Sequence, residues 1–303
     1  MANVLEELST AVSALAAKVG PSVVGVGRSG SGVVVGEGQV LTNAHNLHGT
    51  EVGVTFADGR RAEGRLAGVD ADGDLAVVSV DTAGAAPLSW GAPVPEVGTA
   101  VVALAHHRGV SGFRASFGFV SATGVAFRGP GGRLVEGALE HNAPMARGSS
   151  GGPVVDADGR LLGIDTHRVG EGSYLAVVAD ATLRARVDAL ARGESPRRRR
   201  LGVAIAPGHV ARRLRRSVGL PERDGLLVHD VEETGPAARA GLRAGDLIVS
   251  VAGTPVSSID NLAGALAAAP EGVPAEVGLV RGADELTVVV DLDASGAVPE
   301  SPE

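Results

Sequence analysis

The chain has no cysteine among its 303 residues. A secreted protein of this size could use disulfides, so their absence favours a reducing compartment. Aromatic residues make up only 2% of the chain. The core must therefore be built largely from Val, Leu and Ala, and the sequence offers no stacking platform for single-stranded nucleic acid. The net charge of −8 also disfavours nucleic acid as a partner.

Long apolar runs are missing as well. No stretch approaches about 20 uninterrupted apolar residues, so no membrane-spanning helix is expected. The first residues, MANVLEEL, carry acid where a secretory signal carries base, which predicts a cytoplasmic protein if Met1 is the native start. Apolar residues over 5–16 recur at helical spacing and predict a short amphipathic helix that packs on the protein or on a neighbouring subunit.

A serine flanked by small residues is the strongest chemical signal. Residues 148–153 read Gly-Ser-Ser-Gly-Gly-Pro. A tight turn there leaves the Ser150 hydroxyl accessible and lets the N–H groups of Gly148 and Ser150 converge on a developing oxyanion, with Ser149 contributing only backbone. Such strings are also ordinary loop sequence. A hydroxyl is a weak nucleophile near neutral pH, so the hypothesis requires a base and an orienting carboxylate elsewhere.

His45 and Asp74 fit these two roles. His45 follows an apolar run that ends in small polar residues, which indicates the end of a strand, whereas His48 lies further into the loop. Asp74 directly precedes the apolar segment LAVVSV, so its carboxylate is expected to be partly buried and rigid. Asp70 and Asp72 are interpreted as solvated turn formers.

The order His45, Asp74, Ser150 is that of chymotrypsin-type enzymes. Three segments, VLTNAH at 40–45, DLAV at 74–77 and GSSGGP at 148–153, resemble the signature blocks of the HtrA (DegP-like) serine proteases. The resemblance implies a mostly β fold: a chymotrypsin-like double β-barrel with the catalytic groups in the cleft between the barrels. It also implies a serine endopeptidase that cleaves unfolded or extended polypeptides without a metal or other cofactor.

The same resemblance places Ile164, Asp165 and Thr166 at the substrate pocket. Because no acidic residue clearly lies at the base of that pocket, we expect cleavage after small aliphatic side chains. In the family the N-terminal region helps to build a trimer, so a homotrimer is the implied assembly. The chain departs from the family pattern at Ser149, where Asn is usual, and at Ala146-Arg147, where Asn-Pro is usual. These departures keep a second hypothesis open, a catalytically silent chaperone or peptide-binding scaffold.

Short apolar runs alternate with Gly, Asp and Pro turns from about residue 23 to residue 178, which is typical of antiparallel β-structure. A helix is predicted over 181–191, followed by the basic run of Arg197–Arg200, which we interpret as a solvated linker. We expect an N-terminal helical segment over 1–20, a trypsin-like domain over 21–192, a linker over 193–200, a second domain over 201–293 and a disordered tail over 294–303.

The second domain resembles a PDZ domain of the HtrA type. Residues 225–253 combine a strand, a short capped helix, a Gly-Asp turn and another strand. Such a domain captures the C-terminus of an extended peptide by strand addition. The resemblance makes Leu201, Gly202 and Val203 the carboxylate-binding loop, and places Leu262 and Leu266 on a groove-lining helix over 259–268. Leu201 and Val203 also fit the start of an ordinary strand.

Three further features are given non-catalytic interpretations. His106 and His107 are adjacent, so their side chains point to opposite sides of a strand, and no metal site is expected. His141 is interpreted either as a cleft residue or as a polar residue of the barrel. A second basic cluster, over residues 212–216, is interpreted as a solvated surface.

Overall fold

The computed structural model describes residues 3–91, 94–107, 112–128, 134–170, 172–196, 199–206, 219, 223–270 and 272–293. The chain divides into two compact units, Met1–Pro196 and Arg197–Glu303. Each unit has its own apolar core. The predicted tail and the basic cluster over 212–216 lie outside the described residues, as do Arg197 and Arg198 of the predicted linker.

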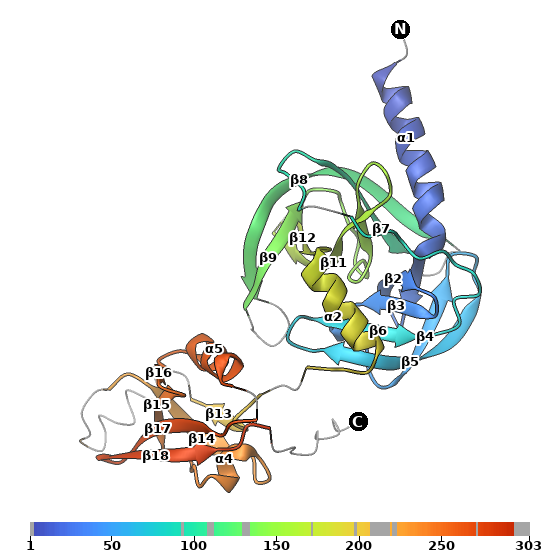
Figure 1. Cartoon of the computed structure of the whole chain (residues 1–303). Coiled ribbons are helices and arrows are strands. Elements are labelled where there is room, and N and C mark those ends of the chain that lie inside the picture. The colour runs from blue at the N-terminus through green and yellow to red at the C-terminus, as the bar shows by residue number, and fades with distance from the viewer. Residues whose placement is uncertain are drawn as a thin grey trace. The chain divides into compact units, whose positions relative to one another are not determined.

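The first half of unit 1 is a closed barrel of six antiparallel strands in the order β1-β2-β3-β6-β5-β4 (Figure 1). These strands are β1 (Val23–Val26), β2 (Gly30–Gly36), β3 (Gln39–Thr42), β4 (Glu51–Phe56), β5 (Arg61–Asp70) and β6 (Leu75–Ser79). Valine fills the interior, because its branched side chain packs well on a pleated surface and alternates with outward residues. The apolar run before His45, which we expected to form one strand, forms two strands, β2 and β3. They are joined by a turn at Gly38, whose φ is 69°.

The second half is another closed six-stranded barrel, in the order β10-β11-β12-β9-β8-β7. Its strands are β7 (Ala100–His106), β8 (Phe113–Arg128), β9 (Leu134–His141), β10 (Pro153–Val155), β11 (Leu161–Val169) and β12 (Ser173–Val178). Closure removes the unpaired edges that an open sheet would expose. The predicted double β-barrel is therefore confirmed.

A shared apolar cluster holds the two barrels together. Leu41 and Leu75 of the first barrel pack in the same cluster as Leu104 and Ile164 of the second, all fully buried. Helix α2 (Ala181–Ala191), predicted at these residues, adds Leu183, Val187 and Leu190 to the same cluster. The loops that carry the catalytic candidates emerge beside this rigid seam.

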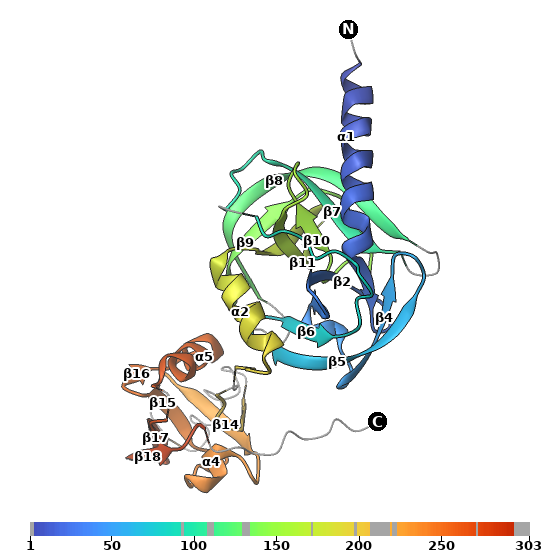
Figure 2. The same ribbon diagram turned by 45° about the vertical axis from the view of Figure 1, so that its right-hand side comes forward.

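The N-terminal helix α1 (Val4–Val19) begins at Asn3, whose side chain accepts a hydrogen bond from the Leu5 N–H. Its second half joins the seam through Leu15 and Val19, as predicted. Its first half projects from the barrels in both views (Figures 1 and 2). Val4 and Leu5 there are 74% and 68% exposed. None of the described helices is long and apolar enough to span a membrane.

Unit 2 is a sheet in the order β13-β14-β15-β17-β18, with β16 paired to β15. Its elements are β13 (Val203–Ile205), β14 (Leu226–Val231), α4 (Pro236–Arg239), β15 (Leu247–Val251), β16 (Thr254–Pro255), α5 (Ile259–Ala268), β17 (Ala275–Arg281) and β18 (Asp284–Val290). The α5 bounds match the prediction, and Ser258 caps this helix by accepting from the Asn261 N–H.

The solvated linker that we expected is wrong at Arg199. This side chain is only 9% exposed and forms an ion pair with Asp293 at 3.2 Å. It also donates a hydrogen bond to the Ala269 carbonyl. Arg200 is more exposed and pairs with Glu232 at 3.1 Å. A guanidinium group that finds a carboxylate and a carbonyl beside the domain is stabilised there, so these two arginines belong to unit 2.

Candidate active site

His45 and Asp74 are brought together at one end of two neighbouring antiparallel strands of the first barrel. His45 lies in the single 3₁₀ turn that follows β3, and Asp74 directly precedes β6, the partner of β3. His45 Nδ1 lies 2.7 Å from Asp74 Oδ2, and the backbone N–H of His45 donates to Asp74 Oδ1 at 3.0 Å. An ionised carboxylate only accepts, so Nδ1 carries the proton and Nε2 is left as the basic atom.

Asp74 is held by the backbone as well as by its carboxylate. Its φ is 54°, in the left-handed region that Asp tolerates better than most residues. Its carbonyl accepts hydrogen bonds from the Ala44 N–H and from Asn43 Nδ2. Besides the two hydrogen bonds from His45, the carboxylate accepts one from Thr166 Oγ1, which lies 3.0 Å from Asp74 Oδ2. The carboxylate, 4% exposed, is thus fixed by three hydrogen bonds.

Asp70 and His48 lie near these two residues in the sequence but do not take the positions of Asp74 and His45. Asp70 is buried rather than solvated, so that expectation was wrong. Its carboxylate accepts from the Gly73 N–H at 2.9 Å and pairs with Arg186 at 3.1 Å, so Asp70 stabilises the turn that precedes Asp74. His48 is exposed.

Small polar residues of the first barrel hold the Ser150 loop, and sequence reasoning missed them. Ser31 Oγ donates to the Gly148 carbonyl at 2.8 Å, and the Ser31 N–H donates to the Ser150 carbonyl at 2.9 Å. Asn46 Nδ2 reaches the same Ser150 carbonyl at 2.9 Å. The signal in the sequence was a Ser inside an apolar strand and an Asn immediately after the base.

The Ser150 hydroxyl donates to the Thr166 carbonyl at 3.2 Å. Within the described residues it makes no hydrogen bond to His45. Thr166 therefore contacts two members of the predicted triad, the nucleophile through its carbonyl and the carboxylate through its hydroxyl. A change of rotamer about the Cα–Cβ bond of Ser150 moves its oxygen away from this carbonyl and toward another acceptor.

The predicted oxyanion loop presents unpaired amides. The N–H groups of Gly148, Ser149 and Ser150 donate to no acceptor among the described residues. Gly148 adopts a φ of 90°, and a Cβ at that position would collide with the Ser29 carbonyl. Glycine is therefore required by both conformation and space. Ser149 Oγ turns inward and donates to the Ala146 carbonyl at 2.8 Å, which leaves its backbone as the part that faces the site.

A cavity of about 270 Å³ adjoins the nucleophile. Of the three predicted pocket residues, Asp165 and Thr166 line it together with Ser150. Ile164 does not line it: its side chain is fully buried in the seam between the barrels.

A buried His–Asp pair lies behind this cavity. His141 on β9 is fully buried, and its Nε2 lies 2.8 Å from Asp165 Oδ1. Burial raises the pKa of the Asp165 carboxyl, and the hydrogen bond and charge of His141 oppose that shift only in part. Asp165, which was predicted at the pocket, is part of its lining. His141 itself is a barrel residue, and Tyr174 stacks against it with ring centroids 5.7 Å apart.

The predicted peptide-binding residues of unit 2 lie at the start of β13 and on α5. Strand β13, at one edge of the sheet, pairs with β14 on one side. Leu201, Leu262 and Leu266 belong to the core cluster, and Val203 packs against it. The N–H groups of Leu201 and Gly202 donate to no acceptor among the described residues, and Gly202 has a φ of 75°. An edge strand with no second partner strand in the described part of the chain, beside two amides without a described acceptor, can accept an extended chain that ends in a carboxylate.

No group of three or more His, Asp or Glu side chains in the described ranges is arranged to hold a metal ion. Burial, together with the neighbouring His107, lowers the pKa of His106.

Comparison with known proteins agrees with both units. A model of the trypsin-like peptidase domain matches residues 30–164, and a PDZ domain model matches residues 227–281. A protein of Bartonella henselae named "Probable periplasmic serine endoprotease DegP-like" is 32% identical over 273 residues, which is 88% of this chain and 53% of that protein. The chain thus spans about half the length of this relative.

Two further similarities cover a larger share of the matched protein. Serine endoprotease DegS of Escherichia coli is 30% identical over 278 residues, 87% of this chain and 76% of that protein. The solved structure of the HtrA-type protease AlgW with a decapeptide superposes with a TM-score of 0.67 at 24% identity, over 92% of this chain and 97% of that one. The last similarity supports the fold alone. With its trypsin-like peptidase domain followed by a PDZ domain, the chain belongs to the HtrA family of serine endoproteases.

Proposed function

We propose that this chain is a serine endopeptidase that cleaves unfolded or extended polypeptides. The observation that carries the proposal is the hydrogen-bonded pair of His45 Nδ1 and Asp74 Oδ2, next to a serine loop whose N–H groups at residues 148–150 donate to no acceptor among the described residues. In this mechanism Ser150 Oγ turns from the Thr166 carbonyl to His45 Nε2, which takes its proton as the oxygen attacks the scissile carbonyl. Asp74 keeps the imidazole in the required tautomer and stabilises its cation.

The tetrahedral oxyanion is stabilised by the amides of Gly148 and Ser150. Since these donors have no acceptor to give up within the described residues, they are available when negative charge develops. His45 then returns the proton to the leaving amine, and water repeats the sequence on the acyl-enzyme. Removal of one oxyanion donor in enzymes of this kind costs about 10²–10³ in kcat.

The adjoining cavity favours small side chains before the scissile bond. Its volume of about 270 Å³ lies below the range of about 300–1,000 Å³ that is usual for ligand pockets. We therefore keep small aliphatic residues as the proposed preference.

The PDZ unit is proposed to recruit peptides through their C-termini. An incoming strand adds to the open edge of β13, and the amides of Leu201 and Gly202 bind the terminal carboxylate. Calorimetric titration of the full chain with one apolar peptide, as free acid and as C-terminal amide, tests this role. Equal affinities for the two forms would remove the carboxylate from recognition.

A homotrimer is kept as part of the proposal. The exposed apolar residues Val4 and Leu5 on α1 are suited to burial against another copy of the chain. Light scattering of the full chain, compared with a Leu5→Glu variant, gives the mass directly. A monomeric wild-type chain would exclude this assembly.

A catalytically silent scaffold remains the second proposed function, because Ser150 Oγ is bonded to the Thr166 carbonyl and not to His45. A fluorophosphonate probe separates the two functions. The endopeptidase labels stoichiometrically and loses labelling in Ser150→Ala, whereas Ser149→Ala, whose hydroxyl is turned to the Ala146 carbonyl, retains it. An unlabelled wild-type chain would favour the scaffold.

A further inference from the structure

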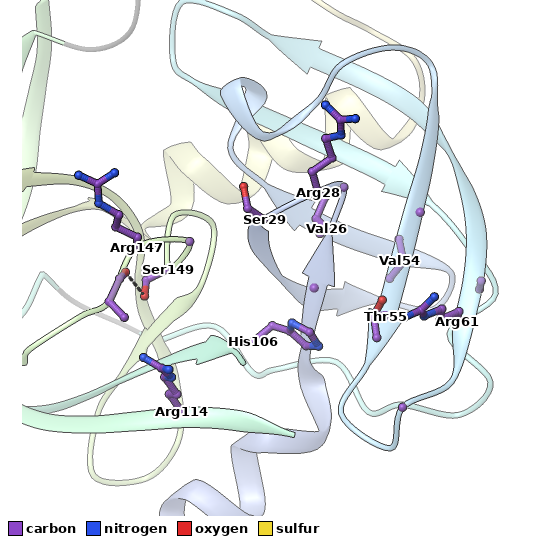
Figure 3. A pocket seen from close by; sticks show the side chains of 18 of the residues that line it. Val26, Arg28, Ser29, Val54, Thr55, Arg61, His106, Arg114, Arg147 and Ser149 are labelled. Carbon is purple, nitrogen blue, oxygen red and sulfur yellow. Dashed lines mark hydrogen bonds between the residues drawn. The ribbon is translucent and has the colours of Figure 1, made fainter. Parts of the chain in front are cut away.

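A second cavity, of about 910 Å³, lies on the other side of the oxyanion loop (Figure 3). Residues 146–149 line both this cavity and the smaller one next to Ser150. Both barrels contribute to its wall: the β1–β2 turn, β4 and β5 from the first, and His106 and Arg114 from the second. Its volume is near the upper end of the range for ligand pockets, which is far more than one side chain needs.

The cavity wall is strongly basic although the chain as a whole is acidic. Four arginines line it, Arg28, Arg61, Arg114 and Arg147, against one acid, Glu63. In Figure 3 these arginines surround the cavity from different elements. Arg28, Arg61 and Arg147 have no carboxylate partner in the part of the chain that the structure describes. A concave wall that carries one sign of charge concentrates ions of the opposite sign.

The β1–β2 turn connects this basic wall to the chemistry. Ser29, next to Arg28, has its carbonyl packed directly against Gly148. Ser31, at the far end of the same turn, donates to the Gly148 carbonyl and to the Ser150 carbonyl. The backbone that presents Arg28 is therefore fixed to the loop that is proposed to bind the oxyanion.

We propose that this cavity binds the part of the substrate that follows the scissile bond, and that it selects chains with two or more Asp or Glu residues there. This inference rests on the proposed endopeptidase function. When the side chain before the scissile bond occupies the cavity beside Thr166, the leaving segment continues past the oxyanion loop into the larger cavity. Carboxylates on that segment meet guanidinium groups that have no other acid to bind.

His106 is consistent with this selection without supplying charge. It lies in the wall among the arginines, and burial together with His107 lowers its pKa. Near neutral pH it therefore contributes a neutral ring that accepts or donates one hydrogen bond. The positive charge of the cavity comes from the arginines.

The test uses two fluorogenic peptides that are identical except for two residues after the scissile bond, Glu-Glu in one and Gln-Gln in the other. With the wild-type chain at low salt we expect kcat/KM to be about three- to tenfold higher for the Glu peptide, since each exposed ion pair contributes modestly. At 0.5 M salt this advantage should shrink strongly, because the pairs are partly exposed.

Arg28→Gln and Arg61→Gln should each reduce the preference for Glu over Gln, and the double variant should bring it close to one. Arg65→Gln is the matched control, because Arg65 lies on the same strand as Arg61 but does not line the cavity. A small activated ester, which has no leaving peptide, should be hydrolysed equally by the wild-type chain and all four variants. Fluorescence of Trp90, the single tryptophan, checks that unit 1 remains folded.

The outcomes separate this inference from the proposed function. If the wild-type chain does not hydrolyse the ester, the proposed endopeptidase function itself is refuted. Normal ester hydrolysis with equal cleavage of the two peptides would overturn the inference alone. Equal cleavage together with a change in ester hydrolysis on addition of inorganic polyphosphate would reassign the cavity to a small anionic effector, and would likewise overturn the proposal.

Discussion

Thr166→Val removes one hydroxyl from the centre of the site and leaves its shape nearly unchanged. The hydroxyl donates to Asp74 Oδ2 at 3.0 Å, and the carboxylate is 4% exposed, so water cannot replace the lost donor. Hydrogen bonds to charged groups contribute about 1.5–3 kcal/mol. Asp74 keeps its two bonds from His45, so we expect a loss near 2 kcal/mol in the free energy of unfolding of unit 1.

That loss corresponds to a fall in the melting temperature of about 4–8 °C for a unit of this size. Trp90 reports the transition of unit 1, since the chain has no other tryptophan and this residue packs on the seam cluster. If half of the 2 kcal/mol also stabilises the transition state, the rate of fluorophosphonate labelling falls about fivefold.

Thr166→Ser is the matched control. It keeps the hydroxyl and the carbonyl that Ser150 contacts, and removes only a methyl group, which costs about 0.8 kcal/mol. The expected order of labelling rates is wild type, then Ser, then Val. If Val labels as fast as wild type and melts at the same temperature, the hydroxyl does not hold Asp74 in place. Equal losses in Ser and Val would mean that the methyl group contributes as much as the hydrogen bond.

Three shorter predictions concern other charged or strained positions. Burial raises the pKa of the Asp165 carboxyl, so the stability this group supplies is present below about pH 4 and is lost as the pH rises through its folded pKa. Asp165→Asn cannot ionise and should gain stability relative to wild type as the pH rises; a constant difference in Trp90 melting between pH 4 and pH 8 would contradict this. Burial alone would raise the pKa of Asp246, but hydrogen bonds from Arg281 and a backbone N–H outweigh it and the pKa is lowered, so the stability of unit 2 should fall as the pH drops below about 4. Calorimetry of Asp246→Asn should show a weaker, less acid-sensitive transition for unit 2, and an unchanged acid sensitivity would refute the role of the pair. Gly151→Ala should abolish labelling because φ is 90° and a Cβ would collide with the Ser31 carbonyl, whereas Gly124→Ala, also left-handed but in open space, should label normally.

The sequence predicted most reliably those features that are encoded within a few residues. Helices α2 and α5 match their predicted bounds, because periodicity and a capping residue are both local. The His45, Asp74 and Ser150 segments were recognisable because each combines a strand end with small polar residues. Strand β5 is not recognisable from its own sequence, RAEGRLAGVD, which contains a single β-branched residue and two glycines. Its place in the barrel comes from its partners β4 and β6.

Charge partners were predicted poorly because they depend on distant parts of the chain. Asp70 was expected in solvent, but Arg186 on α2 and the turn amides bind it. Arg199 was expected in a solvated linker, but Asp293, 94 residues later, pairs with it. A sequence shows that a residue is charged, and only the fold shows whether an opposite charge is near enough to justify its burial.

The His141–Asp165 pair shows what this dependence on the fold means for the site. The two residues lie on β9 and β11, which do not pair with each other; β12 lies between them and pairs with both. Tyr174 on β12 stands opposite His141 and also donates its hydroxyl to the Met145 carbonyl in the segment that leads to the oxyanion loop. Asp165 meanwhile accepts the Gly151 N–H on its carbonyl, directly after the nucleophile. The buried His141–Asp165 pair therefore connects the two anchors of the loop. Only the strand order of the closed barrel brings these residues together, which is why the sequence left the role of His141 open.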